Sequence, residues 1–199
     1  MPSQDFAPNK YILYPNYFGI CSKNVFELSK KYPNLIIDNA HSYFMPDCGF
    51  ASFTSYRKFF DVADGAGLYI KKEIKLPKDK YYYNSIPKNY DEFVQNELRL
   101  DKKEPEFISD CTKDILNSVD FEKERAKRLS IFYEFHEKLK SSNKLHFELT
   151  EFDVPFVYPY LSNSPLDIET FRYWSPLPKN FPEYKFYRYL QPIQLNYHA

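Results

Sequence analysis

The sequence predicts an α/β protein with a parallel or mixed sheet, followed by a small α+β lobe at the C-terminal end. Between residues 11 and 70, short apolar runs alternate with turns and one helix pattern. Strand, helix and strand at this spacing form a βαβ unit, whose two strands pair in parallel. After residue 144 the pattern changes to short alternating runs broken by prolines, which favours edge strands and irregular connections.

The first 70 residues contain four short apolar runs that we expect to be strands: residues 11–14, 35–37, 51–54 and 68–70. The run Leu35–Ile37 is continuously apolar, which is the pattern of a strand covered on both faces. Between the first two runs, Ser22 is expected to cap a helix that continues to about Tyr32, where Pro33 ends it. All four glycines lie in this part of the chain, which indicates special backbone demands there.

The second half of the chain predicts two helices. Residues 71–90 are charged and interrupted by proline, so we expect a loop or crossing segment. Apolar stripes then predict helices over 105–119 and 120–140, the second with His136 as a packing residue rather than a ligand. Runs near 145–149 and 156–158 are strand candidates. We therefore expect a large domain with its crossing segment over 1–118, and the long helix with a small lobe over 119–199.

Composition excludes several function classes. The chain has 27 basic and 27 acidic residues, and this balance argues against nucleic acid as a main partner. No apolar run approaches the roughly 20 residues that span a bilayer, and the start of the chain has no secretion-signal pattern. Three widely spaced cysteines form neither a CxxC pair nor a metal-ligand pattern with histidine. These features predict a cytoplasmic protein with reduced thiols, no membrane partner and no metal site.

An aspartate and a lysine stand at the ends of two predicted strands. Asp38 follows Leu35–Ile37, and Lys58 follows the run at 51–54. Ligands of open α/β sheets bind at the carboxyl ends of strands, so both residues are candidates for a site. A structural ion pair is one interpretation. A Ser-x-x-Lys hydrolase is excluded, because such enzymes also need Ser-Asp-Asn and Lys-Thr-Gly, and the chain offers only Ser109-Asp110-Cys111.

The third interpretation is a site for pyridoxal phosphate (PLP). PLP needs a lysine that binds it covalently, a carboxylate that keeps its ring nitrogen protonated, and donors for its phosphate. Lys58, Asp38 and the hydroxyls of Ser52, Thr54 and Ser55 are the right residue types in the right order. From residue types alone, the ion pair and the PLP site both remain open.

Several motifs in order resemble one family. Residues 16–20 (Asn-Tyr-Phe-Gly-Ile), 36–41 (Ile-Ile-Asp-Asn-Ala-His), 55–60 (Ser-Tyr-Arg-Lys-Phe-Phe) and Asp64-Gly65 resemble the DegT/StrS aminotransferases, which are fold-type I PLP enzymes. Residues 171–178 and 190–193 resemble the small C-terminal lobe of that group. The resemblance implies a partial fold-type I large domain, the cofactor PLP, and amination of nucleotide-linked keto-sugars for surface polysaccharides. Nucleotide-sugars and amino donors would then be its small-molecule partners.

The resemblance also implies a role for individual residues. Lys58 would hold the cofactor and move a proton to and from the substrate carbon. Asp38 would pair with the ring nitrogen, and His41 would lie near the ring oxygen. Ser55, with Ser52 as the alternative, would contact the phosphate. Asn16 would belong to a loop beside the ring.

The resemblance implies that one part of the site is not in this sequence. In the family, the first third of the chain supplies the helix N-terminus that cradles the PLP phosphate and an aromatic ring that stacks on the cofactor. Only 37 residues precede Asp38 here. We therefore expect a truncated aminotransferase completed by a homodimer or by a second polypeptide. The alternative is a catalytically inactive remnant that acts as a binding or assembly partner.

Overall fold

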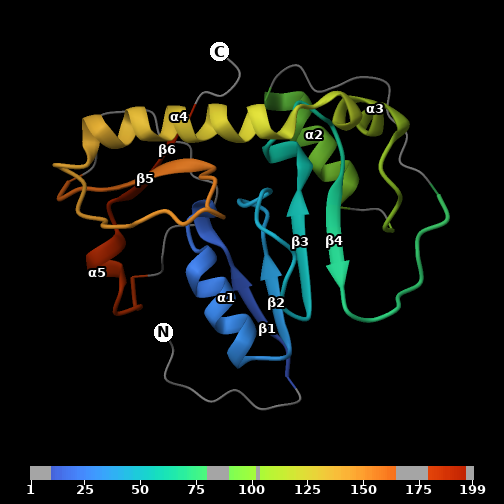
Figure 1. The fold of residues 1–199 in the computed structure, drawn as a ribbon, viewed down its shortest axis with the longest axis horizontal. Helices are drawn as coiled ribbons and strands as arrows, with labels where there is room; N and C mark the ends of the chain where they lie inside the picture. The colour runs from blue at the N-terminus through green and yellow to red at the C-terminus, as the bar shows by residue number, and fades with distance from the viewer. Residues whose placement is uncertain (1–9, 80–89, 102–103, 165–178, 196–199) are drawn as a thin grey trace.

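A computed structural model describes residues 10–79, 90–101, 104–164 and 179–195, and Figure 1 shows its fold. A four-stranded sheet has the order β1-β2-β3-β4, with bounds Ile12–Pro15, Leu35–Asp38, Ala51–Ser55 and Ala66–Ile70. The pairs β1–β2 and β2–β3 are parallel, and β3–β4 is antiparallel. The expected α/β class with a mixed sheet is confirmed.

Helix α1 (Ser22–Lys31) connects β1 to β2 and completes the predicted βαβ unit. It covers one face of the sheet, because Val25 and Leu28 pack against Leu35 and Ile37 in one buried cluster. The alternation of side chains along a strand places Leu35 and Ile37 on the same face. This face is the core of the first half of the molecule.

The opposite face of the sheet is partly open. Strand register aligns Leu13 with Ile36 and Leu68 with Phe53, so these four side chains share the face away from α1. Leu13 and Leu68 are each 59% exposed. Ile36 of β2 is partly buried on this face, so the strand expected to be covered on both faces is fully covered on one and partly covered on the other.

The start of α1 also differs from the expectation. Cys21, not Ser22, is the N-cap residue, and its side chain makes no capping hydrogen bond. The backbone N–H of Ser22 instead donates to the carboxylate of Asp153 at 3.1 Å, from 131 residues further along the chain. The sequence pattern identified the helix, but its cap is a tertiary contact.

The second half contains further helices and a two-stranded sheet: α2 (Tyr90–Leu100), α3 (Asp110–Ser118), α4 (Phe121–Leu139), β5 (Val157–Leu161), α5 (Tyr184–Tyr187) and β6 (Leu190–Gln194). Strands β5 and β6 pair antiparallel, and α4 packs against β5 through Phe132 and Tyr158. The long helix and the β-structure after it were predicted; α2 was not, and residues 145–149 form no strand. The motif at 171–178 lies outside the described residues.

The long helix α4 is tied to the first half by Arg128. This residue is fully buried, donates to the carbonyl oxygen of Phe59 at 2.5 Å, and pairs with Glu124 at 2.7 Å. Its guanidinium also lies over the ring of Phe59. No helix within the described ranges is long and apolar enough to cross a membrane.

Candidate functional site

Three chain segments meet at the carboxyl edge of the parallel strands. Asn16 follows β1, Asp38 ends β2, and Lys58 lies in a short 3-10 helix, η2 (Tyr56–Lys58), directly after β3. The backbone N–H of Asn16 donates to the carbonyl of Asp38 at 2.9 Å, and that of Asn39 donates to the carbonyl of Phe53 at 2.8 Å. The ladder therefore continues past the strand ends and holds the three connections together.

Asn16 and Asn39 hold the segments at this edge together through hydrogen bonds. Asn16 is buried; its amide donates to Asn39 Oδ1 at 3.2 Å, and its Oδ1 accepts from the backbone N–H of Cys21 at 3.0 Å. The carbonyl of Asn39 accepts from the hydroxyl of Thr54 at 3.0 Å. Asn16 thus joins the end of β1 to the start of α1 and the end of β2, and its side chain is largely used for that purpose.

Asp38 and Lys58 act on each other electrostatically without forming a direct ion pair. Burial lowers the pKa of the Lys58 ammonium; the Asp38 carboxylate opposes this shift, and neighbouring Arg57 adds to it. Asp38 Oδ1 accepts from the backbone N–H of Ala40 at 2.8 Å, which orients the carboxylate. The two predicted key residues are thus neighbours in one half-buried site.

His41 belongs to the same group. Burial, with a smaller contribution from the Lys58 charge, lowers the pKa of His41 to about 4, so its ring is neutral at neutral pH. The ring stacks on Phe156, with the ring centroids 4.9 Å apart and the planes at 21°. A neutral imidazole can donate or accept a hydrogen bond beside Lys58 without adding a second positive charge.

The predicted phosphate contacts do not form a cradle. The Ser52 hydroxyl is buried and donates to Asp47 at 2.7 Å, and the Thr54 hydroxyl donates to the Asn39 carbonyl. Ser55 ends β3, and its hydroxyl has no hydrogen bond within the described part of the chain. Lys58, Asp38 and His41 are the residue types that the ring of PLP needs, but among the hydroxyls predicted to contact its phosphate only that of Ser55 is uncommitted.

Two contacts at this site had no signal in the sequence. Arg57 forms an ion pair with Glu97 on α2, the helix that was not predicted. Phe156 lies 115 positions after His41, and its backbone N–H donates to the Phe18 carbonyl at 2.8 Å. Both depend on how distant segments pack, and only a three-dimensional structure could reveal them.

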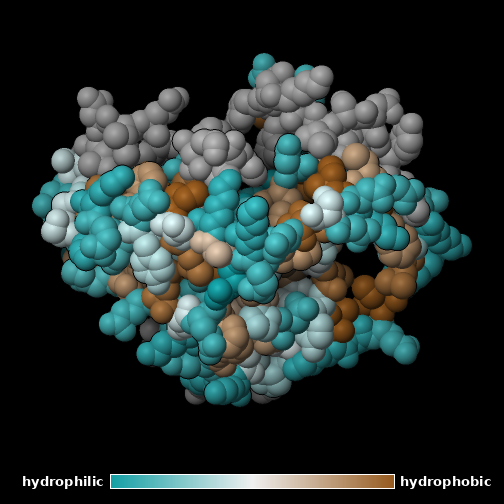
Figure 2. Space-filling model, turned by 45° about the horizontal axis from the view of Figure 1, so that its top comes forward, coloured by the Kyte–Doolittle hydropathy of each residue, from teal (hydrophilic) through white to brown (hydrophobic). Residues whose placement is uncertain are grey.

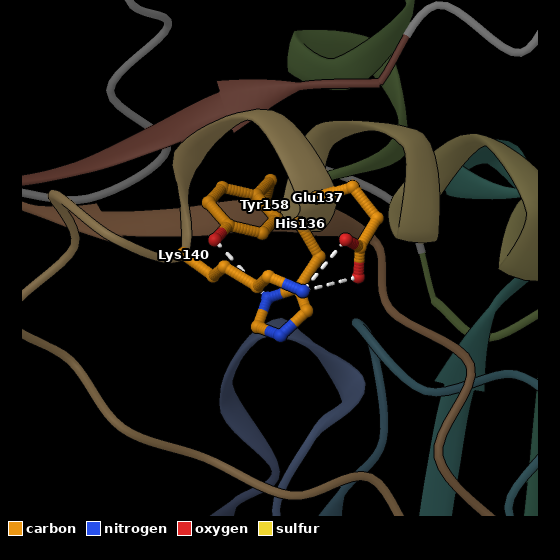
Figure 3. A network of polar contacts seen from close by, with 4 residues as sticks. All are labelled: His136, Glu137, Lys140 and Tyr158. Atoms are coloured by element: carbon orange, nitrogen blue, oxygen red, sulfur yellow. Dashed lines mark hydrogen bonds and ion pairs between the residues drawn. The ribbon is translucent and has the colours of Figure 1, made fainter.

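A pocket lies beside α4 and the start of α1. The pocket is lined by Lys23, His136, Lys140 and residues 145–150. Figure 3 shows His136 beside Tyr158, whose hydroxyl lies 3.3 Å from the ring Nδ1, and Lys140 held by Glu137 at 2.6 Å. The ring of His136 also stacks on Phe132, which confirms a packing role.

The charges of this pocket favour no ligand class. The two lysines, Lys23 and Lys140, stand against two acids: Glu148 in the lining and Glu137, which holds Lys140. The described residues contain no cluster of histidine, cysteine and acidic side chains that could hold a metal ion. The strand-end group around Lys58 is therefore the stronger candidate.

Comparison with known proteins gives no assignment: no model of a known protein family matches the chain, and no curated protein sequence matches it.

Proposed function

We propose that the protein is a PLP-dependent, aminotransferase-like protein that acts on nucleotide-linked keto-sugars with a small-molecule amino donor. One observation carries the proposal. Lys58 and Asp38 lie at the ends of neighbouring strands, and their charges interact although the two side chains form no direct ion pair. The aldehyde and the nitrogen of the pyridoxal ring lie at opposite ends of that ring. A lysine and an acid that serve them must therefore face each other without touching.

When bound, PLP supplies an electron-accepting ring for the negative charge that develops on a substrate carbon. The lowered pKa of Lys58 increases the fraction of neutral amine, which is the form that attacks a carbonyl carbon. The same amine is placed to take a proton from the substrate carbon and return it. The Asp38 carboxylate would stabilise a positive charge at the ring nitrogen, and the neutral ring of His41 would lie near the ring oxygen.

An absorbance titration tests this proposal. The purified full chain should develop the visible absorbance band of lysine-bound PLP, and borohydride should fix the label on Lys58. Lys58→Ala should abolish the band, whereas Lys138→Ala, which removes an exposed lysine on α4, should leave it unchanged. No band at saturating PLP would remove the enzyme function from this chain.

Exposed apolar residues favour a second candidate function, a catalytically silent binding or assembly partner. In Figure 2, hydrophobic residues gather at the right, the side where β4 and the segment after it lie. Leu68, Ile74 and Leu76 are 59%, 45% and 63% exposed. Exposed apolar area of this kind marks interaction surfaces. A second copy or a completing polypeptide would cover it, so light scattering should show a dimer that Leu68→Asp weakens.

A further inference from the structure

Carboxylates of the chain itself occupy the starts of three helices. At α1, Asp153 accepts from the Ser22 N–H. At α3, Asp64 accepts from the N–H and the hydroxyl of Ser109 at 2.8 and 2.7 Å. At α4, Asp120 accepts from the Lys123 N–H at 3.0 Å. A helix N-terminus binds phosphate through the same free N–H groups and positive dipole end, so these three positions are already filled.

The start of α1 is the most informative of the three, because it follows β1 at the edge that carries Asp38 and Lys58. Asp153 is buried there and also accepts from the N–H and the hydroxyl of Thr150 at 2.8 and 2.9 Å. A phosphate at this helix start would have to displace a carboxylate with three hydrogen-bond donors. It would also be repelled by the negative charge of that carboxylate.

The backbone is tightly packed at Gly19, just before the start of α1. Gly19 adopts φ +69°, and a Cβ atom added to it would lie 2.4 Å from the His41 carbonyl oxygen and 2.7 Å from that of Val154. Backbone contacts this close leave no room for a side chain at position 19. The start of α1 therefore lies at the edge of the site, and the Asp153 carboxylate occupies its free N–H group.

From these observations we infer that the Lys58 site binds pyridoxal-type aromatic aldehydes without recognising their phosphate; the inference rests on the proposed function. In the described residues, Ser55 is the only predicted phosphate contact with an uncommitted hydroxyl. One neutral hydroxyl contributes little discrimination compared with a helix N-terminus. The amine of Lys58 would bond to the aldehyde carbon, and the aldehyde oxygen would leave as water with the two amine protons.

The test compares PLP with 5-deoxypyridoxal, which lacks the phosphate and, unlike pyridoxal, cannot close into an internal hemiacetal. The full chain is titrated with each, the adduct is followed by absorbance, and borohydride with peptide mass spectrometry locates it. We expect both to label Lys58, with affinities within about threefold of each other. Ser55→Ala should leave that ratio unchanged, and Lys58→Ala should remove both adducts.

The outcomes separate the inference from the proposed function. If PLP binds at Lys58 about tenfold or more tightly than 5-deoxypyridoxal, the site recognises phosphate and the inference is overturned, while the function stands. A preference for PLP that disappears in Ser55→Ala would assign the recognition of phosphate to Ser55, and it would also overturn the inference. If neither aldehyde labels Lys58, the proposed function itself fails.

Discussion

Two aspartates near the β1–α1 connection have very different surroundings. Asp153 is 1% exposed and accepts three backbone and side-chain hydrogen bonds from Ser22 and Thr150. Asp38 is half-buried and accepts a backbone hydrogen bond from Ala40, while its charge acts on Lys58. A carboxylate surrounded by donors holds the fold together. One that is oriented by a single donor and faces a lysine keeps capacity for a ligand.

Because of this difference, we expect Asp153→Ala to cause the largest loss of stability. The mutation leaves three donors without their acceptor and removes the cap of α1, so the free energy of unfolding should fall by about 3 kcal/mol or more. Denaturant unfolding measures the change. Asp38→Ala is the matched control and should cost less than about 1 kcal/mol. Equal losses in the two variants would remove the distinction between the aspartates.

We expect His41 to make the stability of the protein depend on pH, with an effect of intermediate size. Its pKa is about 4 in the folded protein and about 6.5 in an unfolded chain, so the unfolded state binds more protons between these values. Stability should therefore fall as the pH drops from 6.5 to 4. The pKa difference corresponds to a loss of about 3 kcal/mol in the free energy of unfolding. This is an upper bound, because the ring is partly exposed to solvent.

Unfolding curves of the wild type and of His41→Gln across this pH range measure the contribution. The variant should lose less stability on acidification, because it has no imidazole to protonate. Parallel curves for the two proteins would mean that His41 titrates normally and is not buried beside Lys58.

The parts of the fold that depend on local sequence were predictable. The apolar runs and Pro33 identify β1, β2 and α1, and the parallel pairing follows from their spacing. The rule that ligands bind at the carboxyl ends of strands predicted Asp38 and Lys58 at one edge of the sheet, and both residues lie there in the structure. These features need only local periodicity and a general topological rule.

Features that depend on distant contacts were not predictable. The cap of α1 comes from Asp153, and the ring that stacks on His41 comes from Phe156, both more than 100 positions away. Ser22 has the residue type of an N-cap, but its N–H is satisfied by Asp153 instead. Arg128 is fully buried even though arginine is rarely a core residue, and its contacts with Glu124 and the Phe59 carbonyl offset part of the cost of burial.

The most direct test of the relation between Asp38 and Lys58 is the pKa of the Lys58 amine, from the pH dependence of its labelling rate by an amine reagent and peptide mass spectrometry. Exposed Lys138 serves as the internal reference. Burial should place the pKa of Lys58 below the ordinary value of a lysine, and Asp38→Asn should lower it further, because the Asp38 charge favours the ammonium form. If the pKa of Lys58 were that of an ordinary lysine, or if it did not fall in Asp38→Asn, the two residues would not form one site.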